Sequence, residues 1–287
     1  MADLKVIVFN VERGLCVFAR TPTGYGVMID CGRSRDFSPA AWIAKHEAPW
    51  LTPWSGHSLY KLIVTHPHDD HVEDIETVKR LLPPAVLSRH KDYDWQAVLN
   101  PPDCDPSLNA RNYYQWQQTY SHPITSSPDL GLQLQTFALS PAEAAAINAN
   151  SQQLLNNSSY VTILTYQPRG VTQAWKVVVA GDNETAGWQK LLGKTAFREA
   201  ILGADFYVTA HHGHKSGFAP ELFQVMGKPI LNITSERSGD TSGFDYGPYA
   251  TGAIIEGVSR SHLTTRWDEH ITLTLKDTMR YSIEVSE

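Results

Sequence analysis

The residues best suited to chemistry are gathered in one short stretch, residues 65–71, which reads Thr-His-Pro-His-Asp-Asp-His. Imidazole and carboxylate together suit zinc, and they also suit manganese or iron when more of the ligands are oxygen. We expect a buried strand before this stretch and a helix over residues 73–82 after it, so it forms a loop at a strand end. His66 and His68 would then face one way, and Asp70 and His71 another, so that one loop supplies two adjacent metal ions. The alternative is a solvated, histidine-rich turn.

Two later strand ends repeat this arrangement. An apolar strand over residues 176–180 ends in Gly181-Asp182, where the small glycine allows the backbone to approach a ligand closely. Taken alone, this sequence is a common turn. A further apolar strand over residues 205–209 is followed by His211 and His212. Together, three strands would bring ligands to one edge of the sheets.

The order of elements predicts an α/β fold built from two similar halves. Each half begins with short β-rich runs and continues with strands that alternate with helices, which predicts a four-layer αββα sandwich with helices outside two facing sheets. Ser38 and Pro39 provide the N-cap and the first-turn proline of a helix over residues 40–45. The remaining expected elements include a helix over residues 141–150, a polar break over residues 156–159, a short helix near residues 249–256 and a final hairpin over residues 271–285.

Length and composition favour one domain. The chain has 287 residues, of which 42% are hydrophobic, enough to bury a sizeable core. We therefore expect a single domain over residues 1–287, with an insertion at about residues 86–130 that contains a proline-rich loop at residues 101–106. The net charge of −6 provides no global basic field to collect nucleic acid.

Cysteine content and hydropathy bear on location. The three cysteines, Cys16, Cys31 and Cys104, are widely spaced, which indicates a reducing compartment and argues against a thiolate metal site. The first residues enter an apolar strand without a signal-peptide profile, and the apolar runs are far too short to span a bilayer. We expect a cytoplasmic protein with no membrane partner.

In these motifs the chain resembles the metallo-β-lactamase superfamily, whose signature is His-x-His-x-Asp-His, a Gly-Asp after a strand and a late strand-end histidine. Within it, the chain is most similar to the ComEC-type branch, the soluble domain of DNA-uptake proteins and its free-standing relatives. The matching segments occur in the same order and cover nearly the whole chain apart from residues 86–130. They are residues 8–14, 27–32, 157–159, 180–182, 211–213 and 264–265.

This resemblance implies the roles of the site residues. His66 and His68 would bind a first divalent ion, Zn²⁺ or Mn²⁺, and Asp70, His71 and His211 would bind a second. Asp182 would bridge the two ions, and a water shared between them would become a hydroxide nucleophile at neutral pH. Asp70 would also orient this nucleophile. His212 would be a hydrogen-bonding neighbour of the ligands or a proton donor to the leaving group.

The sequence departs from the resemblance near both metals. Many relatives add a histidine to the first metal from the loop before the Gly-Asp strand, where this chain has Asn156, Asn157 and Ser158, so the first site is short of a nitrogen ligand. After Gly213 the usual serine is replaced by His214-Lys215-Ser216. We assign Asn157, His214 and Lys215 as substrate contacts, against the alternative that His214 and Lys215 are ordinary surface residues.

Three functions remain open from the sequence. The first is a binuclear metal-dependent hydrolase of phosphodiesters, acting on nucleic acid or on a small nucleotide. The second is a hydrolase of a lactone, thioester or amide on the same metal centre. The third is a non-catalytic sensor or assembly subunit that keeps the metals for structure. Tyr113, Trp116 and Tyr120 recur at helical spacing, which favours packing over a stacking wall for a base.

Overall fold

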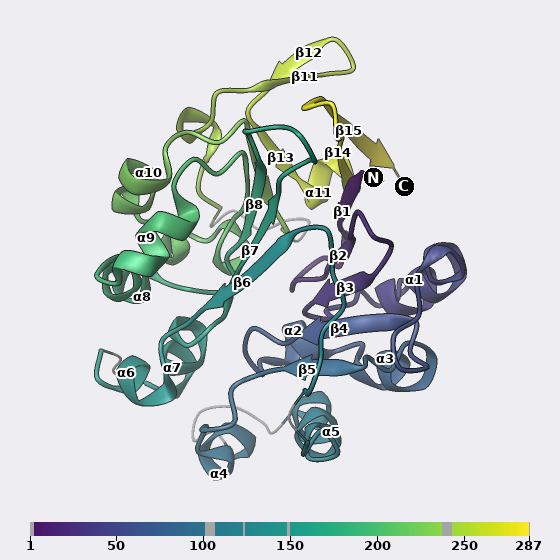
Figure 1. The fold of residues 1–287 in the computed structure, drawn as a ribbon. Coiled ribbons are helices and arrows are strands. Elements are labelled where there is room, and N and C mark those ends of the chain that lie inside the picture. Colours follow the sequence, from purple (N-terminus) through teal and green to yellow (C-terminus); the bar gives the residue numbers. More distant parts are fainter. Residues whose placement is uncertain (1–2, 101–106, 123, 148–149, 237–242, 287) are drawn as a thin grey trace.

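Two β-sheets lie face to face in the computed structural model, which describes residues 3–100, 107–122, 124–147, 150–236 and 243–286 (Figure 1). The first sheet has seven strands in the order β15-β14-β1-β2-β3-β4-β5. Their bounds are Leu4–Val8 (β1), Val17–Arg20 (β2), Gly26–Ile29 (β3), Leu59–Ile63 (β4), Val86–Ser88 (β5), His270–Leu275 (β14) and Tyr281–Ser286 (β15). The pairing is antiparallel from β15 to β3 and parallel from β3 to β5.

The second sheet has six strands in the order β13-β10-β9-β8-β7-β6. Their bounds are Gln133–Phe137 (β6), Val161–Tyr166 (β7), Trp175–Val179 (β8), Phe206–Val208 (β9), Leu231–Thr234 (β10) and His262–Thr264 (β13). The strands β8, β9, β10 and β13 are parallel, so their carboxyl ends lie at one edge. A separate hairpin joins Ala253–Ile255 (β11) to Val258–Arg260 (β12).

Some of the helices cover the outer faces of the sheets. The α-helices of the described residues are Pro39–His46 (α1), Asp69–Val72 (α2), Ile75–Leu81 (α3), Trp95–Leu99 (α4), Leu108–Gln117 (α5), Pro141–Ala145 (α6), Ser151–Asn157 (α7), Thr185–Leu192 (α8), Thr195–Ile201 (α9), Pro220–Met226 (α10) and Thr265–Asp268 (α11). In Figure 1, α1 and α3 lie beside the first sheet, and α8, α9 and α10 beside the second. No helix within the described ranges has the length and apolar character needed to cross a membrane.

Side-chain alternation along the strands creates three apolar layers. Val6 and Val8 of β1 join the core between the sheets, whereas Ile7 points to the opposite face and packs with α1 and α3. A third cluster lies between the second sheet and its helices, around the fully buried Trp188 of α8. Because apolar layers lie on both faces of each sheet, the predicted four-layer αββα sandwich is confirmed.

Local sequence signals explain several helix ends, and two of the predicted elements are corrected. The Ser38 side chain accepts a hydrogen bond from the backbone N–H of Ala41, as expected for an N-cap. The helix predicted over residues 141–150 is shorter, and a second helix, α7, begins after it because Asn150 caps Ser151–Asn157. The predicted polar break at residues 156–157 is therefore the last turn of α7. The short helix near residues 249–256 is wrong, because this segment contains β11 and turns into β12.

The segment predicted as an insertion begins inside the first sheet. Residues 86–88 form the edge strand β5, and the chain continues into α4 and α5. Tyr113 and Trp116 of α5 are buried in the apolar layer of the first sheet, so the aromatic stripe packs, as the helical spacing favoured. The proline-rich loop at residues 101–106 and Cys104 lie outside the described residues.

Candidate metal centre

The loop that follows β4 carries four of the predicted ligands. The strand β4 is buried and lies between the parallel strands β3 and β5, so its carboxyl end opens at the edge where neighbouring strands also end. Helix α2 starts at Asp69, immediately after the loop, and carries Asp70 and His71 in its first turn. The four donors of this short segment fall into two groups, His66 with His68 and Asp70 with His71.

The first group of donors consists of His66, His68 and Asp182. Each offers one atom, and these atoms lie within 4.8 Å of one another. Nε2 of His66 is 2.8 Å from Nδ1 of His68 and 3.9 Å from Oδ2 of Asp182. Two imidazole nitrogens and a carboxylate oxygen that converge in this way fit a divalent ion of the zinc or manganese kind.

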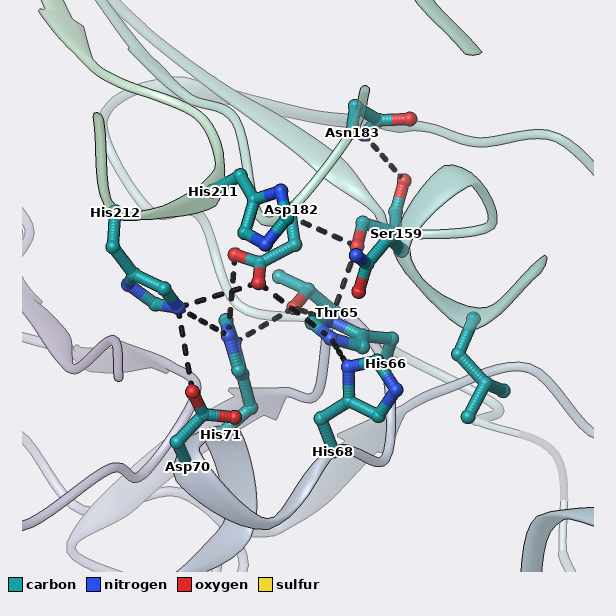
Figure 2. A network of polar contacts seen from close by, with 12 residues as sticks. Thr65, His66, His68, Asp70, His71, Ser159, Asp182, Asn183, His211 and His212 are labelled. Atoms are coloured by element: carbon teal, nitrogen blue, oxygen red, sulfur yellow. Dashed lines mark hydrogen bonds and ion pairs between the residues drawn. The ribbon is translucent and has the colours of Figure 1, made fainter. Parts of the chain in front are cut away.

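The second group consists of Asp70, His71 and His212 (Figure 2). Nε2 of His212 lies 3.3 Å from Nε2 of His71 and 3.5 Å from Oδ2 of Asp70. Asp182 also faces this group, because its two oxygens lie 3.2 Å from His71 and 3.3 Å from His212. The carboxylate of Asp182 thus stands between the two groups, where a ligand shared by two ions would lie.

The structure corrects the choice between the two consecutive histidines after β9. His211 was predicted as a ligand of the second ion, but the side chain in that group is His212. His211 and His212 both adopt the left-handed conformation, with φ of 51° and 52°. This turn directs the two rings apart, so that Nδ1 of His211 lies 2.9 Å from Oγ of Ser216 and 3.4 Å from Oε1 of Glu184.

The first group contains no third histidine. The Asn156 side chain donates from Nδ2 to Oε1 of Glu184, 3.0 Å away, and belongs to neither group of donors. Asn157 was predicted as a substrate contact, but it is fully buried and its Oδ1 accepts hydrogen bonds from the backbone N–H groups of Glu184 and Gly187. It therefore caps the first turn of α8 and does not line the cavity described below.

His214 and Lys215, the other predicted substrate contacts, are exposed on the turn after Gly213. Nδ1 of His214 lies 2.8 Å from Oγ of Ser216, and neither side chain is part of the cavity wall. The structure therefore does not bring Asn157, His214 or Lys215 together with the two groups of donors.

Three residues that the sequence did not single out hold the ligands in place. Oδ2 of Asp30, at the end of β3, lies 2.7 Å from Nδ1 of His71 and accepts a hydrogen bond from the hydroxyl of Thr65 at 2.6 Å. Oγ of Ser159 lies 3.1 Å from Nδ1 of His66 and accepts from the backbone N–H of Asp182. Such partners fix the tautomer and orientation of a ligating imidazole. The available signals were their positions: Asp30 and Ser159 lie in the matching segments 27–32 and 157–159, and Thr65 begins the histidine-rich stretch.

Burial and charge set different protonation states for the two groups. Burial lowers the pKa of His66, and it lowers the pKa of His68 to about 4. Burial also opposes a charge on His71, but Asp182 and Asp30 outweigh it and raise its pKa well above the ordinary value. In the same way, Asp182 and Asp70 overcome burial and raise the pKa of His212 to about 9. Near neutral pH, the first group therefore offers free imidazoles, whereas the second holds protons that an ion must displace.

A cavity of about 900 Å³ opens over the two groups. His68, Asp70, Asp182, His211 and His212 lie in its wall. One side is formed by residues of α4 and α5, and the other by residues of α6 and α7, so the two halves of the chain enclose it. These helical sides are largely apolar and include Ala97, Val98, Ala110, Ala142, Ala145, Leu154 and Leu155.

Comparisons with known proteins agree with this arrangement. The sequence model of the Metallo-beta-lactamase superfamily matches residues 10–98, which include β2 to β5 and the histidine loop. No sequence match to a curated protein was found. The matched segment is less than a third of the chain, and it contains the histidine loop and the helix that follows it.

Solved structures with a similar course of the chain include three of different activity. A long form RNase Z from yeast is 14% identical with a TM-score of 0.45, and the alignment covers 85% of this chain but only 39% of that one. A diphosphatase from the PhnP family is 11% identical with a TM-score of 0.49, covering 99% of this chain and 100% of that one. The Rm3 metallo-beta-lactamase is 14% identical with a TM-score of 0.38, covering 72% and 75%.

Proposed function

We propose that this protein is a binuclear metal-dependent hydrolase that cleaves phosphodiesters. The observation that carries the proposal is the position of Asp182, whose carboxylate oxygens face His66 on one side and both His71 and His212 on the other. A carboxylate between two sets of nitrogen and oxygen donors is the arrangement expected for a ligand that two divalent ions share. The order of motifs, similar to the ComEC-type branch, favours a phosphodiester among the bonds that such a centre can cleave.

The residues of the two groups would have the following roles. His66, His68 and Asp182 would hold one ion, and Asp70, His71, His212 and Asp182 the other. When bound, two Zn²⁺ or Mn²⁺ ions would activate water and polarise the bond to be cleaved. Asp30 and Ser159 keep the rings of His71 and His66 oriented, so that the donors are organised before an ion arrives.

The test is cleavage by protein loaded with manganese or zinc. We expect metal-dependent hydrolysis of bis(p-nitrophenyl) phosphate, and cleavage of at least one of single-stranded nucleic acid, double-stranded nucleic acid or a dinucleotide. Asp182→Asn should abolish it, and Asp36→Asn, which removes an exposed carboxylate elsewhere, should not. Absence of cleavage of every phosphodiester by protein that carries two equivalents of metal would overturn the proposal, and it would favour the sensor role if esters and thioesters also stay intact.

A second candidate is a hydrolase of a lactone, thioester or amide. The apolar sides of the cavity favour it, since Ala97, Val98 and Leu154 offer contact area for an acyl chain and no hydrogen-bonding side chain. Turnover of carboxylic esters or thioesters by protein that leaves every phosphodiester intact would establish this activity in place of the first.

A further inference from the structure

The turn formed by residues 12–14 is clamped against the histidine loop. Gly14 has φ of +113°, and a Cβ placed on it would lie only 2.1 Å from the carbonyl oxygen of Asp70, so only glycine fits there. The backbone N–H of Leu15 donates to the same oxygen, and the hydroxyl of Ser235 donates to the carbonyl of Gly14 at 2.7 Å. The backbone of Arg13 is therefore fixed beside Asp70.

The Arg13 side chain extends from this fixed backbone into the wall of the cavity. Its Nε lies 3.4 Å from Oδ2 of Asp70, and 72% of the side chain is exposed. A guanidinium group has five N–H donors, and one long contact leaves most of them free. The backbone of Arg13 is thus fixed, while its guanidinium group is accessible. A residue that binds an oxyanion through two hydrogen bonds needs both properties.

Arg13 is also the one lysine or arginine among the described residues that line the cavity. Apart from Asp70 and Asp182 of the metal centre, the wall carries Asp69, Glu73, Asp92, Asp94 and Glu184. Asp69 is hydrogen-bonded to Ser107 and Asn109, and Asp94 caps α4, and both side chains lie in the cavity wall. Beyond Arg13 and the metal centre, the walls therefore repel anions.

We propose that Arg13 binds an anionic group of the substrate beside the metal centre, and that the cavity accepts a compact substrate with a single such group. This inference rests on the proposed hydrolase function and names its substrate class: a small phosphodiester whose remaining part is uncharged or carries hydrogen-bond donors. A long polynucleotide would bring further phosphates against Glu73, Asp92 and Glu184. The competing explanation is that Arg13 only neutralises the charge of Asp70. In that case, replacing Arg13 would affect charged and neutral substrates alike.

The first experiment measures inorganic phosphate binding by calorimetry to zinc-loaded protein at low ionic strength. Arg13→Ala should weaken phosphate binding by 10-fold or more, with unchanged metal content, because a charge-assisted contact is lost. Arg13→Lys should restore part of the affinity. Arg80→Ala, which removes an exposed arginine from α3 outside the cavity wall, should bind phosphate like the wild type. Equal phosphate binding by wild type and Arg13→Ala would overturn the inference, and so would a loss of phosphate binding that only follows a loss of metal.

The second experiment compares substrates of different charge. Arg13→Ala should raise KM for bis(p-nitrophenyl) phosphate about 10-fold with little change in kcat, and should leave hydrolysis of neutral p-nitrophenyl acetate unchanged. If wild-type protein binds phosphate through Arg13 yet cleaves no phosphodiester, the proposed function fails while the anion site stands. The two failures are therefore distinguishable.

The third experiment tests the size limit by competition. A dinucleotide should inhibit cleavage of bis(p-nitrophenyl) phosphate more strongly than a 20-nucleotide strand does at the same molar concentration. Replacing Glu73 and Asp92 together by glutamine and asparagine should increase inhibition by the long strand and leave inhibition by the dinucleotide unchanged. Tighter binding of the long strand to wild-type protein, with a steep fall as salt is raised, would contradict the limit.

Discussion

Oδ2 of Asp30 lies 2.7 Å from Nδ1 of His71, although 41 residues separate the two in the sequence. Both side chains are fully buried, and burial raises the pKa of Asp30 while the hydrogen bonds and charge of His71 and Thr65 counter that rise. Because Asp30 occupies Nδ1, the other ring nitrogen of His71 is left to face Asp182. This contact connects the end of β3 to the metal centre.

Replacing Asp30 by asparagine should weaken metal binding. Asparagine keeps the oxygen that accepts from the backbone N–H of Thr65, but its NH₂ group cannot accept from Nδ1 of His71, so the ring loses its preferred tautomer. We expect a 10- to 100-fold loss of affinity for the second ion, the usual effect of removing such a partner. Competition with a metal-binding dye would measure it. Asp36→Asn is the matched control, and equal affinities of the two variants would show that Asp30 serves folding alone.

Replacing His211 and His212 one at a time by alanine shows which of the two binds metal. His212→Ala should reduce bound zinc from two equivalents to about one, because Asp70 and His71 lose the donor that lies against both. His211→Ala should retain two equivalents, since His211 faces Ser216 and Glu184. Elemental analysis of both purified variants gives the answer. The reverse result would restore the assignment that the sequence suggested.

The stability of the metal-free protein should be greatest near neutral pH. Folded His212 keeps its proton up to about pH 9, whereas an unfolded histidine releases it near about 6.5, so its ion pairs stabilise fully below about pH 6.5 and are lost as pH rises through about 9. His68 affects stability at acid pH. The pKa of folded His68 is about 4, so between about pH 6.5 and 4 this histidine binds a proton in the unfolded state but stays neutral in the folded state. The free energy of unfolding therefore falls as pH drops from about 6.5 towards 4.

Thermal melting of chelator-treated protein from about two pH units below to about three pH units above the unperturbed histidine pKa of about 6.5 tests this expectation. The Tm should be several °C lower at each end of the range than near neutral pH. His212→Asn should make the alkaline side less steep, with the remaining slope expected from His71, and should leave the acid side unchanged. An alkaline side that is as steep in the variant as in the wild type would assign the loss to other groups.

Asn157 should matter for stability and not for substrate affinity. Asn157→Ala removes the acceptor of two backbone N–H groups at the start of α8, and we expect a loss of about 2 kcal/mol in the free energy of unfolding. KM should stay within 2-fold of the wild type, about the scatter expected when no contact is lost. Asn157→Asp, which keeps the acceptor, should be the milder variant. Denaturant unfolding and steady-state kinetics together distinguish the two roles. A rise in KM without a change in the free energy of unfolding would show that Asn157 contacts the substrate.

The amino-acid sequence by itself determined the type of fold and most of the donor set. The spacing of His66, His68, Asp70 and His71 depends only on the local chain, because a short loop after a strand can divide its donors between two groups. Asp182 could be predicted for a similar reason, since Gly181 and an apolar strand place a carboxylate at a sheet edge. The helix–strand order fixed the layers, because each strand and helix has to bury its apolar side.

Only the tertiary structure decided which of two adjacent histidines joins the centre, what Asn157 does and how charge is distributed around the cavity. His211 and His212 are equivalent as sequence, and the left-handed turn that separates them is followed by Gly213, where a Cβ would collide with the Thr234 side chain. Asn157 is polar and lies next to the expected site, but the chain folds so that its side chain meets the start of α8. Arg13 lies 57 positions before Asp70, and no local pattern could place a residue of a surface turn beside a metal ligand. Contacts between distant segments are set by how the layers pack, and that information is not contained in any single stretch of the chain.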